Sequence, residues 1–105
     1  MNLFDIFITN ISWGSGSKSR PVLVIQINNR TISVFSITSQ YENKSEAVQS
    51  LYFKINDCLQ AGLDRQSYID TGTLLELPFS VFNKKLPIGK LTAEDMQRFL
   101  DFLSS

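Results

Sequence analysis

The chain has 105 residues, of which 43% are hydrophobic and 19% charged; this composition excludes a disordered protein and predicts one folded domain over residues 1–105. Ten basic residues balance ten acidic ones, which excludes a strongly basic nucleic-acid coat but leaves room for a local basic patch. The single cysteine, Cys58, cannot form an intramolecular disulfide, and a reducing compartment fits it best.

The chain has no histidine, and this removes several kinds of chemistry. Ser-His-Asp and Cys-His nucleophilic sites are excluded, and a lone cysteine does not make a zinc site. Residues 14–16, Gly-Ser-Gly, read as a flexible loop and not as a phosphate-binding P-loop, so we expect no metal and no cofactor. The chain also begins without a secretory signal and holds no long apolar run, so we expect a cytoplasmic protein without membrane contact.

Alternating and β-branched residues predict a series of short strands. They are expected at residues 3–11, 21–27, 31–38, 50–56, 68–70 and 74–82. Pro21 stands at the first position of the second strand, where its missing N–H is tolerated. Gly72 and Pro78 are expected to interrupt the last two strands.

The segments between these strands carry turn and loop signals. Residues 12–19 are rich in Gly and Ser and predict a flexible loop. The pair Asn28-Asn29 is a two-residue turn that joins its flanking strands into an antiparallel hairpin. Residues 39–49 are polar and predict a mobile segment, and residues 57–62 predict one helical turn closed by a glycine.

The C-terminal segment carries the clearest helix signal. Thr92 is an N-cap residue with Asp95 three positions on, a capping box with Asp in place of Glu or Gln. The apolar residues that follow recur at helical spacing and form one face: Met96, Phe99, Leu100 and Leu103. Short strands followed by one helix predict a mainly β fold of five to seven strands, a small closed or half-closed barrel with the C-terminal α-helix packed on it.

The predicted hairpin brings two polar residues together at one rim of this barrel. Its antiparallel strands place Arg20, before the first strand, beside Thr38, at the end of the second. A guanidinium next to a hydroxyl suits a phosphate group, because arginine binds phosphate oxygens in a bidentate fork. The same residues also fit a solvated loop charge and an ordinary β-branched strand residue, and the pattern alone leaves both interpretations open.

A resemblance to the MazF/PemK toxins bears on this choice. Residues 18–26, in which Arg20-Pro21 precedes an apolar run, resemble the signature strand of that family, and Thr38 stands where its next strand ends in Ile-Thr. Other segments, in the same order, resemble the family's first strand, the part after its central turn and the start of its terminal helix: residues 5–7, 62–70 and 88–92.

The resemblance implies an SH3-like barrel of the CcdB/MazF type, and a homodimer that cleaves single-stranded RNA at specific sequences without a metal ion. Such a protein is the toxin of a type II toxin–antitoxin system, neutralised by a cognate antitoxin protein. Arg20 and Thr38 match the catalytic positions, where Arg20 stabilises the charged phosphorane and Thr38 orients the phosphate or the attacking hydroxyl. The residues expected to bind the substrate are Lys18, Ser19, Gln26, Ser39 and Asp70. The apolar residues expected in the dimer interface include Phe79, Phe82 or Phe102.

The chain departs from the family pattern at several points. Phe4 replaces the glycine that usually precedes the acid of the first strand. Residues 72–75 stand where the family often has an acid followed by Gln-Ile-Arg, so the general base is unassigned, with Asp70 and Glu76 as candidates. Two other functions stay open: a non-enzymatic CcdB-like poison of DNA gyrase, since fold alone does not decide function, and a binding domain that has lost the chemistry.

Overall fold

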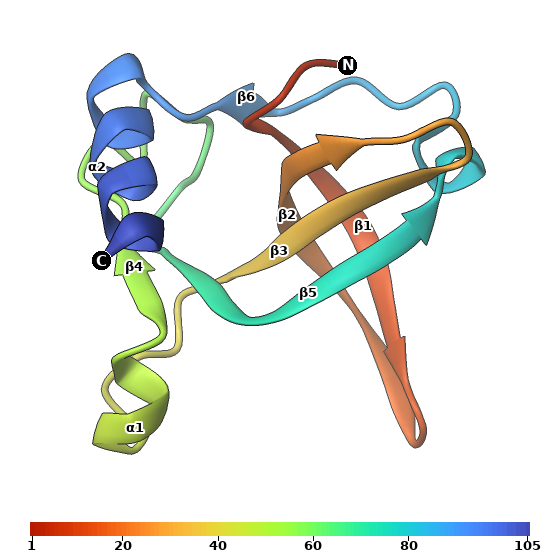
Figure 1. The fold of residues 1–105 in the computed structure, drawn as a ribbon. Coiled ribbons are helices and arrows are strands. Elements are labelled where there is room, and N and C mark those ends of the chain that lie inside the picture. Colours follow the sequence, from red (N-terminus) through yellow and green to blue (C-terminus); the bar gives the residue numbers. More distant parts are fainter.

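The computed structural model describes residues 1–105, apart from the side chain of Trp13. Its strands form one six-stranded antiparallel sheet in the order β4-β5-β3-β2-β1-β6, which curls into a half-barrel (Figure 1). The strands are β1 (Asp5–Trp13), β2 (Gly16–Ile27), β3 (Thr31–Thr38), β4 (Tyr52–Lys54), β5 (Tyr68–Pro78) and β6 (Gly89–Lys90). The helical elements are α1 (Glu46–Gln49), the 3₁₀ helix η1 (Phe79–Phe82) and α2 (Ala93–Ser104). The predicted mainly β fold with a C-terminal helix is confirmed.

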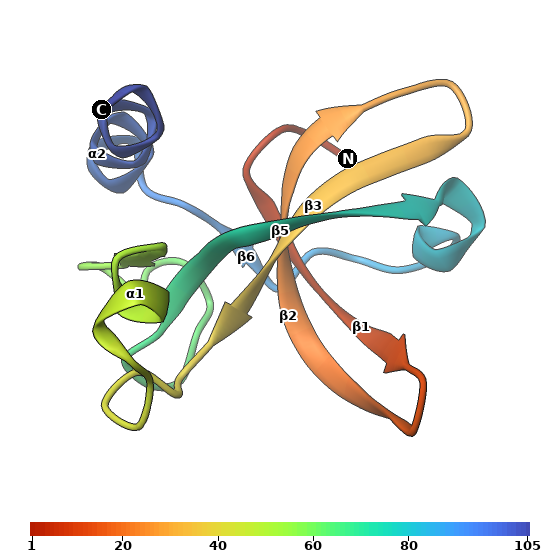
Figure 2. The ribbon, with the colours of Figure 1, turned by 60° about the horizontal axis from the view of Figure 1, so that its bottom comes forward.

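Residues 12–19, predicted as a flexible loop, form the end of a β-hairpin instead. β1 and β2 pair up to the tip, where Gly14 and Ser15 alone make the turn, and two residues are the commonest length for a hairpin connection. The arm projects away from the rest of the molecule in both views (Figure 1, Figure 2), and its polar, exposed side chains lack the alternation that marks a half-buried strand. Lys18 and Arg20 consequently lie on a strand and not at the end of a loop.

Alternation along the strands divides the apolar side chains between the two faces of the sheet. The larger core lies between one face, α2 and the loop before β5, and consists of Ile6, Leu23, Phe35, Ile37, Phe53, Ile55, Cys58, Ala61, Leu63, Ile69, Leu91 and Phe99. The smaller core lies on the other face, against η1, and consists of Phe7, Val22, Val24, Ile32, Val34 and Phe82. Phe82 is buried inside the chain, its ring 5.2 Å from that of Phe7, so it is not available to a dimer interface, contrary to expectation.

Helix α2 begins after Thr92, as predicted, but its buried stripe differs from the prediction. Phe99 is fully buried, and the ring of Phe102 lies 6.5 Å from it, so the residues at spacing i and i+3 face the sheet. Leu100 and Leu103, one position further on, are therefore turned outward and are 43% and 44% exposed.

In the part of the chain that the structure describes, no helix has the length and hydropathy to cross a membrane.

The region between β3 and β5 holds more helix and less strand than the sequence pattern suggests. Within residues 39–49, predicted as mobile, α1 forms one short turn, capped by the Ser45 hydroxyl, which accepts a hydrogen bond from the N–H of Val48 at 3.3 Å. The strand expected at residues 50–56 is only the three-residue β4, although its flanking residues Leu51 and Ile55 still form single backbone hydrogen bonds, with Thr71 and Ser67. β6 was not predicted, and its two residues pair with the edge of β1.

β5 continues through the residue that was expected to interrupt it. Between two successive pairs with β3, at Asp70 and at Leu75, the strand carries extra residues that form a bulge. Gly72 lies in this bulge, which is a common place for a strand glycine, and Pro78 ends the strand. The expected break at Gly72 is therefore wrong. The strand does stop at Pro78, but residues 79–82, expected as strand beyond it, form the 3₁₀ helix η1 instead.

The backbone at Phe4 adopts the left-handed conformation, with φ of 69°. Glycine takes this conformation freely, whereas other residues adopt it at a cost. The N–H of Phe4 donates to the carbonyl of Val24 at 2.7 Å, which holds this turn against β2. The position at which the MazF/PemK pattern has a glycine thus has a backbone that suits one.

Two glycines hold the turn at residues 57–62 against β6. The predicted turn is present, and its closing residue, Gly62, has a φ of +88°. A Cβ atom on Gly62 would lie 2.2 Å from the carbonyl oxygen of Ile88, and a Cβ atom on Gly89 would lie 2.0 Å from that of Ala61. The two backbones therefore meet directly, with no room for a side chain between them.

Replacing Gly89 by alanine is expected to lower the free energy of unfolding by at least about 2 kcal/mol, because the added methyl group overlaps backbone that must move. Gly14→Ala is the matched control, since a Cβ atom there has nothing within 4 Å. Urea unfolding followed by circular dichroism measures both variants. Equal unfolding midpoints for Gly89→Ala and the wild type would contradict this contact.

Candidate functional site

β2 and β3 separate at Pro21. The last pair of residues that the two strands form at this end is Val22 with Ser36. Continuing the same register by one residue would place Pro21 opposite Ile37. Proline has no N–H, so the hydrogen bond that would continue the pairing cannot form.

The other neighbour of β2 shows which way Pro21 faces. Its partner on β1 is Ile8, whose carbonyl oxygen accepts a hydrogen bond from Lys85 Nζ at 3.0 Å on the outer edge of β1. Because the carbonyl of Ile8 points outward, Ile8 and Pro21 form a non-hydrogen-bonded pair, in which the backbone polar groups of the two residues point away from each other. The nitrogen of Pro21 therefore faces β3. The sequence placed Pro21 at the start of its strand, but it lies inside β2, where one side of the strand has lost its partner.

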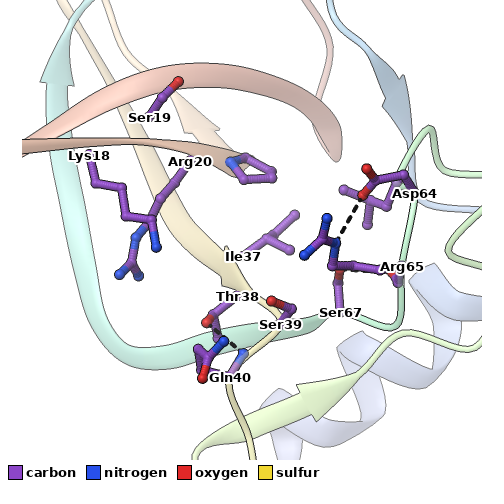
Figure 3. A pocket seen from close by; sticks show the side chains of 12 residues that line it. Lys18, Ser19, Arg20, Ile37, Thr38, Ser39, Gln40, Asp64, Arg65 and Ser67 are labelled. Atoms are coloured by element: carbon purple, nitrogen blue, oxygen red, sulfur yellow. Dashed lines mark hydrogen bonds and ion pairs between the residues drawn. The ribbon is translucent and has the colours of Figure 1, made fainter.

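The separated strand ends bound an open cavity of about 250 Å³, named here the β2–β3 cleft (Figure 3). Its lining residues come from β2, from the end of β3 and the segment that follows it, and from the loop before β5: Lys18, Ser19, Arg20, Pro21, Ile37, Thr38, Ser39, Gln40, Leu63, Asp64, Arg65 and Ser67. Five residues predicted for the site are therefore brought together: Lys18, Ser19, Arg20, Thr38 and Ser39. The hairpin predicted Arg20 and Thr38 side by side at one rim of the barrel. In the structure both residues line the cleft that opens between the two strands.

Gln26 and Asp70, which were predicted with them, do not line the cleft. Gln26 is exposed near the far end of β2, six residues along the strand from Arg20, a distance of about 20 Å in extended chain. Asp70 lies closer, opposite Ser36 in the β3–β5 pairing. Side chains directly opposite in an antiparallel pair share a face, so Asp70 projects on the same face as Ser36 and, two residues on, Thr38.

The two candidate bases differ in position. Asp70 is half-buried, and its Oδ1 accepts a hydrogen bond from the N–H of Gly72 at 2.8 Å. Glu76 is exposed near the other end of β5, where it accepts from the hydroxyl of Thr31 at 3.0 Å. Since Glu76 pairs with the middle of β3, about 16 Å of strand separates it from Thr38. Only Asp70 lies near the cleft.

Arg65 adds a cation that the sequence analysis missed. Figure 3 shows Lys18 and Arg20 on one side of the cleft and Arg65 on the other. Arg65 pairs with Asp64 at 3.3 Å, and both side chains are well exposed, so the pair contributes little energy. Three cations against one carboxylate make the cleft attractive to an anion, although the whole chain is neutral.

The hydroxyl of Thr38 is oriented by the turn that follows it. Its Oγ1 accepts a hydrogen bond from the N–H of Gln40 at 3.1 Å. A hydroxyl that accepts one bond in this way still has its own hydrogen to donate. Thr38 can therefore donate to a phosphate oxygen held between the cations.

All three tyrosines of the chain gather beside the cleft and are named here the tyrosine cluster: Tyr41, Tyr52 and Tyr68. Burial raises the pKa of Tyr52, the Asp70 carboxylate raises it further, and the charge of Arg20 partly opposes both effects. Burial also raises the pKa of Tyr68, with the charge of Glu42 as the next cause. Because both pKa values lie above the ordinary value near 10, both phenols keep their proton at neutral pH.

The described residues include no group of three or more His, Cys, Asp or Glu side chains placed to share a metal ion. In comparisons with known proteins, the chain matches no family model and no curated protein sequence. The chemistry of the cleft and the resemblance in its strands are therefore what bear on function.

Replacing Pro21 by alanine is expected to restore the missing N–H and let β2 and β3 pair one step further, which narrows the cleft. The backbone amide that the substitution introduces should then exchange slowly with solvent deuterium, since it donates to the Ile37 carbonyl. Hydrogen exchange measured by NMR follows this amide directly. If the introduced amide exchanged as fast as those of the exposed hairpin tip, the role given to Pro21 would be contradicted.

Proposed function

We propose that this protein is the toxin component of a type II toxin–antitoxin system, an endoribonuclease that cleaves single-stranded RNA at specific sequences without a metal ion. The observation that supports the proposal most is the β2–β3 cleft, where Lys18, Arg20 and the hydroxyl of Thr38 line one open cavity. The resemblance of residues 18–26 and 35–39 to the MazF/PemK strands supports it further. The left-handed backbone at Phe4 agrees with that resemblance.

In the proposed reaction, the ribose 2′-hydroxyl attacks the neighbouring phosphorus. A bond forms between phosphorus and O2′, and the bond to O5′ breaks, which gives a 2′,3′-cyclic phosphate and a free 5′-hydroxyl. Charge builds up on the two non-bridging oxygens in the transition state, and the planar fork of Arg20 is suited to pair with them. The guanidinium of Arg20 supplies a fixed positive charge and not a proton. Thr38 donates a hydrogen bond to the same phosphate.

The attacking hydroxyl must lose a proton, and we propose Asp70 as the carboxylate that accepts it. One of its oxygens holds the N–H of Gly72, which leaves the other oxygen free to accept. Asp70 lies on the same sheet face as Thr38, two pairs away along the β3–β5 ladder. The departing 5′ oxygen takes a proton from solvent, so protons balance over the step.

The proposal includes two protein partners. A second copy of the chain completes a homodimer, as in the family that the chain resembles. The cognate antitoxin is proposed to lay a disordered acidic segment over the β2–β3 cleft, because the cleft collects cations on an otherwise neutral chain. Such a segment would compete with RNA for Arg20.

The proposal is tested with purified protein, a defined single-stranded RNA and excess EDTA. We expect cleavage that leaves cyclic phosphate and 5′-hydroxyl ends, and no cleavage when the nucleotide at the scissile position is 2′-deoxy. Cleavage that requires an added divalent metal, or that proceeds at the 2′-deoxy position, would contradict the mechanism. Inhibition of DNA gyrase by a protein that leaves RNA intact would favour the CcdB-like alternative.

A further inference from the structure

The tyrosine cluster is a stack of rings from three separate segments. The ring of Tyr41, in the segment after β3, stacks on that of Tyr68 in β5, with centres 4.5 Å apart and planes at 11°. The ring of Tyr52, in β4, lies 6.3 Å from Tyr41 and is tilted by 47°. All three side chains are half-buried, so each keeps part of its surface in solvent.

Each of the three tyrosines is connected to the β2–β3 cleft. Tyr68 is the direct partner of Thr38 in the β3–β5 pairing, so the two side chains lie on one face of neighbouring strands, about 5 Å apart in backbone. Tyr41 follows Gln40, a residue that lines the cleft. The charge of Arg20 also reaches Tyr52. Figure 1 and Figure 2 both show the end of β3, α1 and β4 gathered at one corner of the molecule.

Cations beside aromatic faces suit a single-stranded nucleic acid. The cations contact the phosphate, and an unpaired base stacks on an aromatic ring, whatever the base, because every base has a π-face. A duplex keeps the faces of its bases covered, and an acidic peptide would use the cations but not the stack. The protonated hydroxyls of Tyr52 and Tyr68 can in addition donate to the edge of a base.

We propose that the tyrosine cluster is a binding site for one base of a single-stranded RNA, stacked on the outer face of Tyr41, while the adjoining phosphate lies in the β2–β3 cleft. This inference rests on the proposed function and names the part of the substrate that the cleft does not hold. The base adds a third ring to the stack that Tyr41 and Tyr68 already form.

The experiment uses the full chain labelled with 3-fluorotyrosine and a DNA heptamer, which keeps the bases and phosphates but has no 2′-hydroxyl to react. Because the chain has only three tyrosines, all of its ¹⁹F signals report on the cluster. We expect the heptamer to shift these signals, and an abasic heptamer or inorganic phosphate to leave them in place.

Variants then separate stacking from charge. By fluorescence anisotropy with a labelled heptamer, Tyr41→Leu, which keeps the bulk but not the ring, should weaken binding roughly 5- to 100-fold. Tyr41→Phe should bind as the wild type does, since stacking needs the ring alone. Leu86→Ala removes a bulky apolar side chain that is 86% exposed, in the segment between η1 and β6 and outside the cleft, and serves as the matched control.

Equal affinities for Tyr41→Leu and Leu86→Ala, or ¹⁹F signals that the abasic heptamer shifts as much as the intact one, would overturn the stacking site. Because the heptamer is not cleaved, these outcomes do not depend on catalysis. Base-dependent ¹⁹F shifts in a protein that never cleaves RNA would support the stacking site and at the same time contradict the endoribonuclease proposal.

Discussion

Replacing Arg20 by alanine is expected to lower the rate of RNA cleavage about 10²–10³-fold, the usual effect of removing one preorganised group that stabilises transition-state charge. Arg20 is half-buried at the cleft and sits across from Thr9 on β1. Within the described chain, the side-chain ion pairs involve Arg65 and Arg98, so the charge of Arg20 is not engaged in one. The substitution should therefore change the free energy of unfolding by only about 0.5 kcal/mol.

Three further variants make this expectation specific. Arg20→Lys should also lose most activity, because a point charge cannot reproduce the planar fork. Lys18→Ala should lower the cleavage rate less than Arg20→Ala does. Its main effect should be weaker RNA binding, and this loss of affinity should be larger at low salt. Arg30→Ala is the matched control, an exposed arginine at the opposite end of the β2–β3 hairpin. Full cleavage by Arg20→Ala in the presence of EDTA would show that the cleft is not the active site.

The elements that the sequence predicted correctly are those whose signal is local. The hairpin of β2 and β3 follows from apolar runs on either side of Asn28-Asn29, and α2 follows from a cap residue before an apolar stripe. The approach of Arg20 to Thr38 follows from the hairpin alone. The cleft between Arg20 and Thr38 does not follow from the hairpin. It depends on whether the nitrogen of Pro21 faces β1 or β3, and the register of β2 with β1 sets that direction.

The features that the sequence left hidden depend on contacts between distant segments. Arg65 is an ordinary loop cation until the fold places its loop across from Arg20, 45 positions earlier in the chain. Each tyrosine of the cluster is isolated in its own segment, with no spacing that relates it to the other two. The hairpin arm was missed for a different reason: it is exposed on both faces, so its residues need no apolar alternation.

Asp95 is the carboxylate that joins α2 to the sheet. It is fully buried, and the N–H of Asp95 donates to the Thr92 hydroxyl at 3.2 Å, as the capping box predicted. The reciprocal half of the box is replaced by longer-range contacts. The side chain accepts hydrogen bonds from the N–H of Asn56 at 3.3 Å and of Asp57 at 2.8 Å, in the turn after β4. It also pairs with Arg98 Nη1 at 2.6 Å.

Replacing Asp95 by alanine is expected to lower the free energy of unfolding by about 2–4 kcal/mol, because it leaves two backbone N–H groups without their acceptor and removes the ion pair with the partly exposed Arg98. That is a large part of the roughly 5–15 kcal/mol that holds a domain of this size together, so the variant should be partly unfolded at 37 °C. Asp101→Ala is the matched control: it lies on the same helix, but is exposed and accepts only from Gln97 at 3.2 Å. Asp95→Asn keeps the volume and one acceptor oxygen of the side chain. Its free energy of unfolding should therefore lie between those of Asp95→Ala and Asp101→Ala. Urea unfolding curves that coincide for Asp95→Ala and Asp101→Ala would show that α2 is held by its aromatic stripe alone.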